Sequence, residues 1–207
     1  MSDYLNNLLL EVCEDDNMYT IQTKQHLAQR KIILNDVVDE DVVRNITLNI
    51  FQWNKEDKDI PIEKRKPIWL YLNSPGGDVT EGLNVIDVIK ASQTPVYTVC
   101  FATCASMAFH IFIAGHKRYC FKNSILLIHD GEVSISNSSS KAKDTMKFIE
   151  SLDERVKQHI LENTKITSEF YESIYDTEYY LFANDKGKEL GCVDYIIGED
   201  VPLSTIL

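Results

Sequence analysis

Short apolar runs alternate with helical patterns through the middle of the chain, and this alternation restricts the possible fold more than any other feature. The runs are KIILND from residue 31, PIWLYLN at 67–73, PVYTVCFA at 95–102 and SILLIH at 124–129. Residues 79–92 and 106–115, which separate the later runs, carry apolar side chains at helical spacing. PIWLYLN has almost no polar face, which is typical of a parallel strand buried on both sides. The pattern predicts an α/β fold of repeated βαβ units.

Length and composition limit the chain to one domain of ordinary type. Its 207 residues can bury a single core. The composition is 44% hydrophobic, yet no apolar run approaches the roughly 20 residues that cross a bilayer. The net charge of -11, without any basic block, argues against nucleic acid. We therefore expect neither a membrane nor nucleic acid as a partner.

The N-terminal residues and the cysteines predict a reducing compartment. MSDYLNNLLLEVCEDDN has no basic leader ahead of its apolar residues and no small-residue cleavage site, so we expect no secretory signal. The five cysteines form no CxxC pair, and several lie in apolar runs. The expectation is a cytoplasmic protein with reduced thiols.

Helical patterns also occur outside the repeated units. Residues 4–13 predict a short amphipathic helix, and the apolar residues from Val42 to Ile50 predict another. Residues 141–164 predict a long, charged helix with a narrow apolar stripe, suited to packing across a core or to subunit contact. The polar residues from 130 predict an extended or mobile segment, and residues 178–200 predict a turn, a short helix and a final strand.

Three chemically useful elements follow three successive predicted strands. They are the Gly76-Gly77 turn, Ser106 and His129. Carboxyl ends of parallel strands meet at one edge of a sheet, so the three elements can converge there. A serine, a histidine base and backbone donors aimed at an oxyanion are what acyl transfer requires. The amides near Gly77 and Met107 are the natural donors.

Each of these residues also has an ordinary structural interpretation. Ser106 stands at the start of an apolar helix, where serine is a common N-cap. His129 could be a boundary residue after a strand, and SPGG alone is only a turn. The remaining histidines show no metal-ligand spacing, so we assign no metal and no cofactor. The joint occurrence at successive strand ends is what favours catalysis.

Three stretches resemble the proteolytic subunit of the Clp protease (ClpP) family. They are YLNSPGGDVTEGLNVIDVIK, CASMAFHIFIAGHKRYCFKNSILLIH and KELGCVDYII, and the resemblance runs from about Arg30 to Ile197. It implies a ClpP/crotonase-like fold, with residues 30–207 as one peptidase domain and residues 1–29 as a divergent N-terminal segment. It also implies a serine endopeptidase of two stacked heptameric rings, a homo-oligomeric tetradecamer to which an AAA+ unfoldase feeds polypeptide substrates.

The resemblance assigns roles to individual residues. Ser106 matches the nucleophile, His129 the general base, and the amides of Gly77 and Met107 the oxyanion hole. The helix at 141–164 matches the handle that joins the rings. For the third member of the triad the family expects an aspartate, and EYYLFAN has Glu178 in its place, with Asp176 as the alternative two residues earlier. We prefer Glu178.

Departures from the family keep a second hypothesis open. After His129 the family continues with Gln-Pro and a glycine-rich strand, whereas this chain has DGEVSISNSSS. The family's N-terminal strand-loop, which contacts the ATPase, is also missing from the sequence. The leading hypothesis is an active, ATP-dependent Clp-type serine peptidase. The alternatives are a catalytically weak or inactive ring subunit and, from the crotonase side of the fold, an acyl-CoA enzyme.

Overall fold

The computed structural model describes residues 17–133, 135 and 138–207, so the helix predicted at 4–13 lies outside the described residues. Within them, one mixed sheet contains every strand. The strands are β1 (Lys31–Leu34), β2 (Ile68–Ser74), β3 (Val96–Ala105), β4 (Lys117–Phe121), β5 (Ile125–Ile128), β6 (Tyr179–Phe182) and β7 (Tyr195–Ile197). The predicted α/β class is confirmed.

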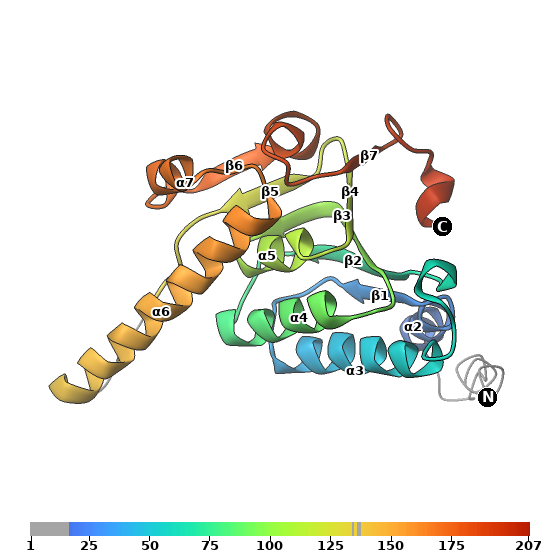
Figure 1. Ribbon diagram of the computed structural model, residues 1–207, viewed down its shortest axis with the longest axis horizontal. Coiled ribbons are helices and arrows are strands. Elements are labelled where there is room, and N and C mark those ends of the chain that lie inside the picture. Colours follow the sequence, from blue (N-terminus) through green and yellow to red (C-terminus); the bar gives the residue numbers. More distant parts are fainter. Residues whose placement is uncertain (1–16, 134, 136–137) are drawn as a thin grey trace.

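The sheet divides along its longest strand, β3. Strands β1, β2, β3, β4 and β7 are parallel neighbours in that order. Residues 97–100 of β3 pair with β4, whereas residues 103–105 pair with β5, also in parallel. Strand β6 then pairs with β5 in the antiparallel direction. As a result, β3 delivers its C-terminal end to the junction with β5 and β6 (Figure 1).

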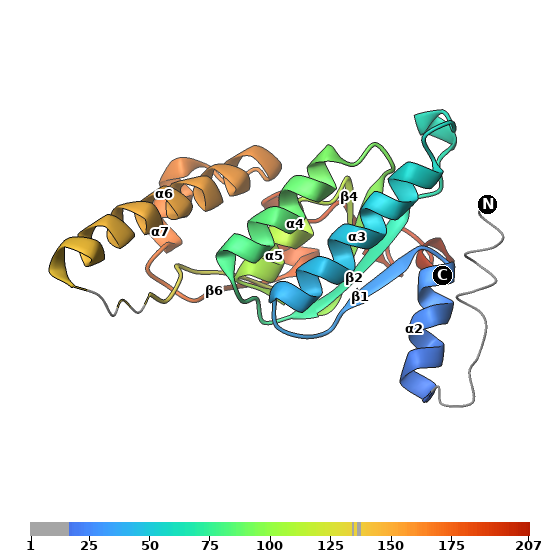
Figure 2. The same cartoon turned by 90° about the horizontal axis from the view of Figure 1, so that it is seen from below.

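The described helices are α2 (Met18–Ala28), α3 (Glu40–Glu56), α4 (Val79–Ala91), α5 (Met107–Ile113), α6 (Ser139–Asn163) and α7 (Ser168–Ile174). Helices α3, α4 and α5 form a row along one face of the sheet (Figure 1). Helix α3 packs on α4, α4 on α5, and α5 on the near end of α6 (Figure 1). All seven residues of α5 are buried, which makes it the central helix of the core. Helix α2 stands beside β1, at the opposite end of the molecule from α6 (Figure 2).

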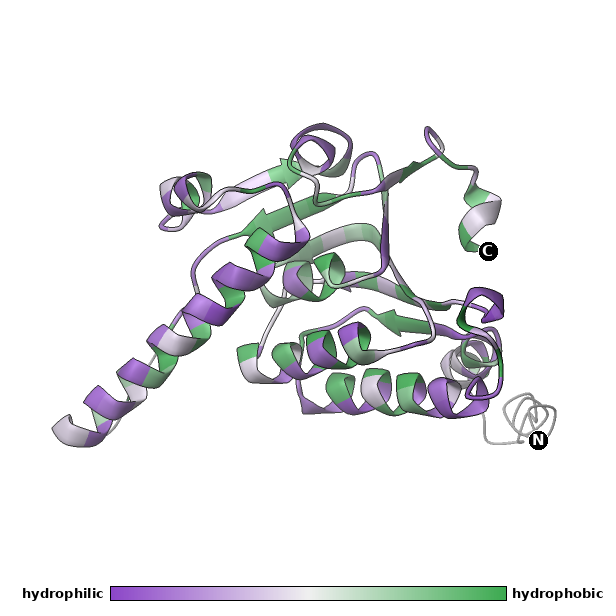
Figure 3. Ribbon diagram, viewed as in Figure 1, coloured by the Kyte–Doolittle hydropathy of each residue, from purple (hydrophilic) through white to green (hydrophobic). Residues whose placement is uncertain are grey.

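Helix α6 extends well beyond the body of the molecule. Of its 25 residues only His159 and Ile160, near the C-terminal end, are buried. Hydrophilic residues dominate its surface, with apolar side chains interspersed (Figure 3). The prediction of a long helix at 141–164 is confirmed, with Ser139 and Asn163 as the observed ends.

Several local predictions were wrong. β2 is not buried on both sides, because only every second residue is buried. Its other face carries half-buried Trp69 and Tyr71, which pack with other aromatic side chains near the C-terminal residues. Two strands were missed: KRYCF forms β4, and YYLF forms β6 where a turn was predicted. Helices α2 and α7 were missed as well: α2 buries none of its residues, and α7, which buries Tyr171 and Ile174, has only seven residues.

Candidate active site

Ser106 alone makes the turn from β3 into α5. β3 ends at Ala105 and α5 begins at Met107. The backbone of Ser106 has φ 52° and ψ -127°, a left-handed conformation that costs a non-glycine residue roughly 1–3 kcal/mol. A strained turn from strand to helix is how α/β hydrolases expose a nucleophilic serine. The conformation therefore suits a reactive hydroxyl.

The hydroxyl of Ser106 does not cap the helix that it begins. Asp39 and Asp78, at the N-caps of α3 and α4, accept hydrogen bonds from backbone amides in the first turn. Ser106 occupies the same position in α5 but makes no side-chain capping bond. The N-cap interpretation is therefore right about position and wrong about the hydrogen bond.

The Gly76-Gly77 turn lies directly against this serine. Both glycines have positive φ, at 99° and 152°. A β-carbon on Gly76 would stand 2.7 Å from Ser106 Cβ and 2.9 Å from Met107 N, so only glycine fits there. The contact joins the Gly76-Gly77 turn after β2 to Ser106 after β3, the first two of the three predicted strand ends.

Two backbone amides at this contact have no acceptor. Val38 pairs with the turn by donating to the Gly76 carbonyl and accepting from Asp78 N, at 2.8 and 2.9 Å. This pairing leaves the amide of Gly77 unused. Within the described part of the chain, neither Gly77 N nor Met107 N donates a hydrogen bond. Unpaired amides beside a serine are the donors that an oxyanion hole uses.

Strand β5 brings His129 to the same place. Ala105 lies opposite Leu127 in the parallel pairing of β3 and β5, and Ser106 N donates to the Leu127 carbonyl at 3.1 Å. His129 follows two residues after Leu127. No hydrogen bond joins Ser106 Oγ to His129 in the described structure. Such a contact is often long in a free enzyme and tightens when substrate binds.

The register of β5 and β6 places Glu178 against His129. Ile128 lies opposite Tyr179, so the next step of the same antiparallel register sets His129 opposite Glu178. Their side chains meet, with His129 Nδ1 2.8 Å from Glu178 Oε1. A carboxylate oxygen only accepts, so Nδ1 carries the hydrogen and Nε2 is free to take a proton. This is the arrangement that a histidine base needs.

Asp176 lies elsewhere. It lines an acidic cleft between α6 and α7, with Glu150, Asp153 and Tyr175 among its neighbours. It lies in the turn that follows α7, two residues before Glu178. In the described part of the chain Asp176 makes no hydrogen bond or ion pair with His129. Of the two carboxylates that the sequence left open, Glu178 is the one in contact with the imidazole.

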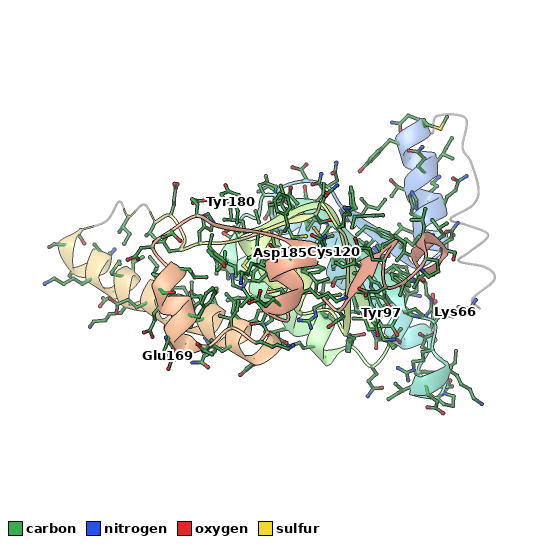
Figure 4. The ribbon with its side chains drawn as sticks, turned by 90° about the horizontal axis from the view of Figure 1, so that it is seen from above. Lys66, Tyr97, Cys120, Glu169, Tyr180 and Asp185 are labelled. Atoms are coloured by element: carbon green, nitrogen blue, oxygen red, sulfur yellow. The ribbon has the colours of Figure 1, made fainter. Side chains whose placement is uncertain are left out.

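Tyr180 is a contact that the sequence analysis missed. It lies in the edge strand β6 and is labelled in Figure 4. Its hydroxyl donates to Glu178 Oε2 at 3.4 Å, so both carboxylate oxygens have partners. Residues two apart in a strand share a face, so the spacing of Glu178 and Tyr180 could have indicated it once β6 was recognised.

Other kinds of site have little support here. In residues 17–133, 135 and 138–207, no group of three or more His, Cys, Asp or Glu side chains is placed to hold a metal ion. None of the helices in these ranges is long and apolar enough to cross a membrane. The cysteines described, Cys100, Cys104, Cys120 and Cys192, are buried and free.

Comparison with known families agrees with the resemblance in the sequence. The family model described as Clp protease matches residues 14–200. The match includes the Gly76-Gly77 turn, Ser106, His129 and strand β6. Since it spans most of the 207 residues, the chain belongs to the Clp protease family, and this membership implies a peptidase.

Proposed function

We propose that this chain is a serine endopeptidase in which Ser106 is the nucleophile, His129 the general base and Glu178 the group that orients the base. The observation that carries the proposal is the 2.8 Å contact of His129 with Glu178 beside the strained turn at Ser106. The free amides of Gly77 and Met107, where the glycine turn meets the serine turn, complete the requirements for acyl transfer.

The reaction follows from the positions of these groups. His129 Nε2 takes the proton of Ser106 Oγ as the oxygen attacks a peptide carbonyl. Glu178 holds the Nδ1 hydrogen and stabilises the imidazolium that forms. The amides of Gly77 and Met107 donate to the oxyanion, and each donor of this kind lowers the barrier by roughly 3–4 kcal/mol. The imidazolium then protonates the leaving amine, and water hydrolyses the acyl-serine by the same steps.

We further propose that the subunits form two stacked heptameric rings in the cytoplasm, and that an AAA+ unfoldase delivers unfolded polypeptides. Helix α6 supports the ring contact, because it leaves the body of the subunit and exposes Met146 and Phe148. Exposed apolar side chains on a protruding helix are typical of a surface that another subunit covers. Residues 30–207 would form the peptidase domain.

A second candidate is a ring subunit with weak or no activity. It is favoured by the exposure of Glu178, whose side chain is 58% accessible to solvent. A carboxylate in water holds an imidazole less firmly than a buried one, because water competes for both.

A fluorophosphonate probe distinguishes the two candidates. We expect the probe to label wild-type protein on Ser106 and the S106A variant not at all, with peptide hydrolysis lost in parallel. Native mass spectrometry of the same samples reports the ring size. A folded ring that neither labels nor hydrolyses peptides would contradict the peptidase proposal and support the inactive subunit.

A further inference from the structure

Two buried histidines face each other beneath the candidate site. His110 lies in α5, four residues after Ser106, and His159 lies in α6. Their side-chain rings are 6.0 Å apart between centroids, and the residues are only 5% and 6% exposed. Polar groups buried to this degree need hydrogen-bond partners. The proposed reaction uses neither histidine, so their partners call for another explanation.

The hydrogen bonds of His159 define its protonation. Its Nε2 lies 2.9 Å from the backbone carbonyl oxygen of His110, which can only accept, so Nε2 carries the hydrogen. Asn163 Nδ2 lies 3.1 Å from His159 Nδ1 and can donate to it. The same amide also donates to the His159 carbonyl at 2.6 Å, which fixes its orientation. His159 is thus neutral, in a single tautomer selected by Asn163.

The carbonyl that His159 binds belongs to the helix of the nucleophile. α5 has seven residues, so the carbonyl of His110 is among the last four, which lack a partner within an α-helix. The amide of Ala114 goes to Ile111 and Phe112 instead. The His159 side chain therefore supplies the donor that α5 cannot, and it ties α6 to α5.

A displacement of His110 would also move groups of the candidate site, because His110 contacts the Ser106 backbone and lies near His129. Its backbone amide donates to the Ser106 carbonyl at 3.4 Å, and its side chain is close enough for His129 to affect its pKa. His110 Nδ1 is also the one buried side-chain nitrogen or oxygen without a partner in the described residues. Packing in the core thus holds the His110 imidazole in place, although its Nδ1 makes no hydrogen bond within the described part of the chain.

We propose that His159 is a positioning residue for the serine. Its Nε2–H tautomer, selected by Asn163, holds the His110 carbonyl and so fixes the orientation of α5 and of Ser106. The near end of α6 then has to be docked for the serine to react. This inference rests on the proposed function, since it presumes that Ser106 is a nucleophile.

The test compares rates of fluorophosphonate labelling and the separate values of kcat and KM for a peptide. H159F keeps the ring and loses the donor, whereas H159Q keeps a donor at nearly the same place. We expect H159F to lower the labelling rate and kcat by about fivefold to tenfold, the equivalent of one hydrogen bond, with KM unchanged. We expect H159Q to retain at least about half of the wild-type rate.

The matched control is I160V, which loses a methylene from the neighbouring buried residue and destabilises the fold without removing the donor. We expect it to label at the wild-type rate. N163A keeps the imidazole of His159 but removes the hydrogen bond that selects its Nε2–H tautomer, so we expect slower labelling. This variant provides the test if H159F fails to fold.

The outcomes separate this inference from the proposed function. Wild-type labelling by H159F or N163A, or equal slowing by I160V, would overturn the positioning role. H159Q as slow as H159F would do the same, because the donor would then be irrelevant. Wild-type protein that never labels contradicts the proposed function instead.

Discussion

The buried histidines predict a loss of stability at mildly acidic pH. Burial lowers the pKa of His110 to about 3 and that of His159 to about 4, from an ordinary value of 6.5. Charged groups near His159 are Lys90, which lowers its pKa, and Glu162 and Asp87, which raise it. His110 is faced by His159 and by His129 of the candidate site. Burial dominates in both cases, so both residues remain neutral in the folded chain at neutral pH.

The size of this stability loss follows from the linkage between proton binding and unfolding. Because the folded pKa values are depressed, the unfolded chain binds more protons once the pH falls below 6.5, and stability declines from there toward the folded values. At about pH 5 the unfolded histidine is stabilised by roughly 1.5 pKa units, at 1.36 kcal/mol per unit. Each histidine therefore costs about 2 kcal/mol of unfolding free energy between about pH 7.5 and pH 5.

Urea unfolding of wild-type and H159Q protein at the two pH values measures this cost. Glutamine can donate to the same carbonyl and does not titrate. We expect the stability that H159Q loses between about pH 7.5 and pH 5 to be about 2 kcal/mol smaller than the wild-type loss. Carboxylates titrate alike in both proteins and cancel in the comparison. Equal losses in the two proteins would refute the argument that His159 is buried in its neutral form.

Three further predictions concern the site and the core. We expect E178Q to lower kcat for peptide hydrolysis by roughly 10²- to 10⁴-fold and D176N to change it by less than about twofold. A large loss in D176N with little change in E178Q would show that the register of β5 and β6 is shifted by two residues. G76A places a β-carbon 2.7 Å from Ser106 Cβ, so we expect labelling to slow by about 10²-fold in a protein whose circular dichroism is unchanged. Arg30 pairs at 2.6 Å with Asp57, whose side chain is 2% exposed, so R30M takes the ion-pair partner from a buried carboxylate that keeps a hydrogen bond from Thr94. Urea unfolding is expected to show a loss of about 3–5 kcal/mol, and a loss below about 1 kcal/mol would contradict the burial argument.

The repeated units could be predicted because their signals are local. Apolar runs and helical spacing indicated β2, β3, β5, α4 and α5 within a few residues of their observed ends. The meeting of Gly76, Ser106 and His129 also follows from a general property, since parallel strands present their carboxyl ends at one edge. Nothing beyond the order of elements was required for that inference.

The parts that were missed depend on distant contacts. β4 begins with exposed Lys117 and half-buried Arg118, so KRYCF lacks the apolar run that marked its neighbours. β6 is a strand only because it pairs with β5, about 50 residues earlier in the chain. The resemblance already favoured Glu178 over Asp176, but the contact of Glu178 with His129 depends on that register and cannot be read from the sequence. The pairing of His110 with His159 joins α5 and α6 across a similar separation, and their spacing in the sequence gives no sign of it.

The late position of β6 has a consequence for the order of events during synthesis. The serine and histidine strands leave the ribosome before the carboxylate strand, which follows after α6 and α7 and closes a long loop when it pairs. Contacts between residues this far apart in the sequence form slowly, and later than local contacts. On the proposed assignment, a nascent chain cannot orient its histidine until about nine tenths of it has been made, and the unfinished subunit cannot cut its own emerging polypeptide.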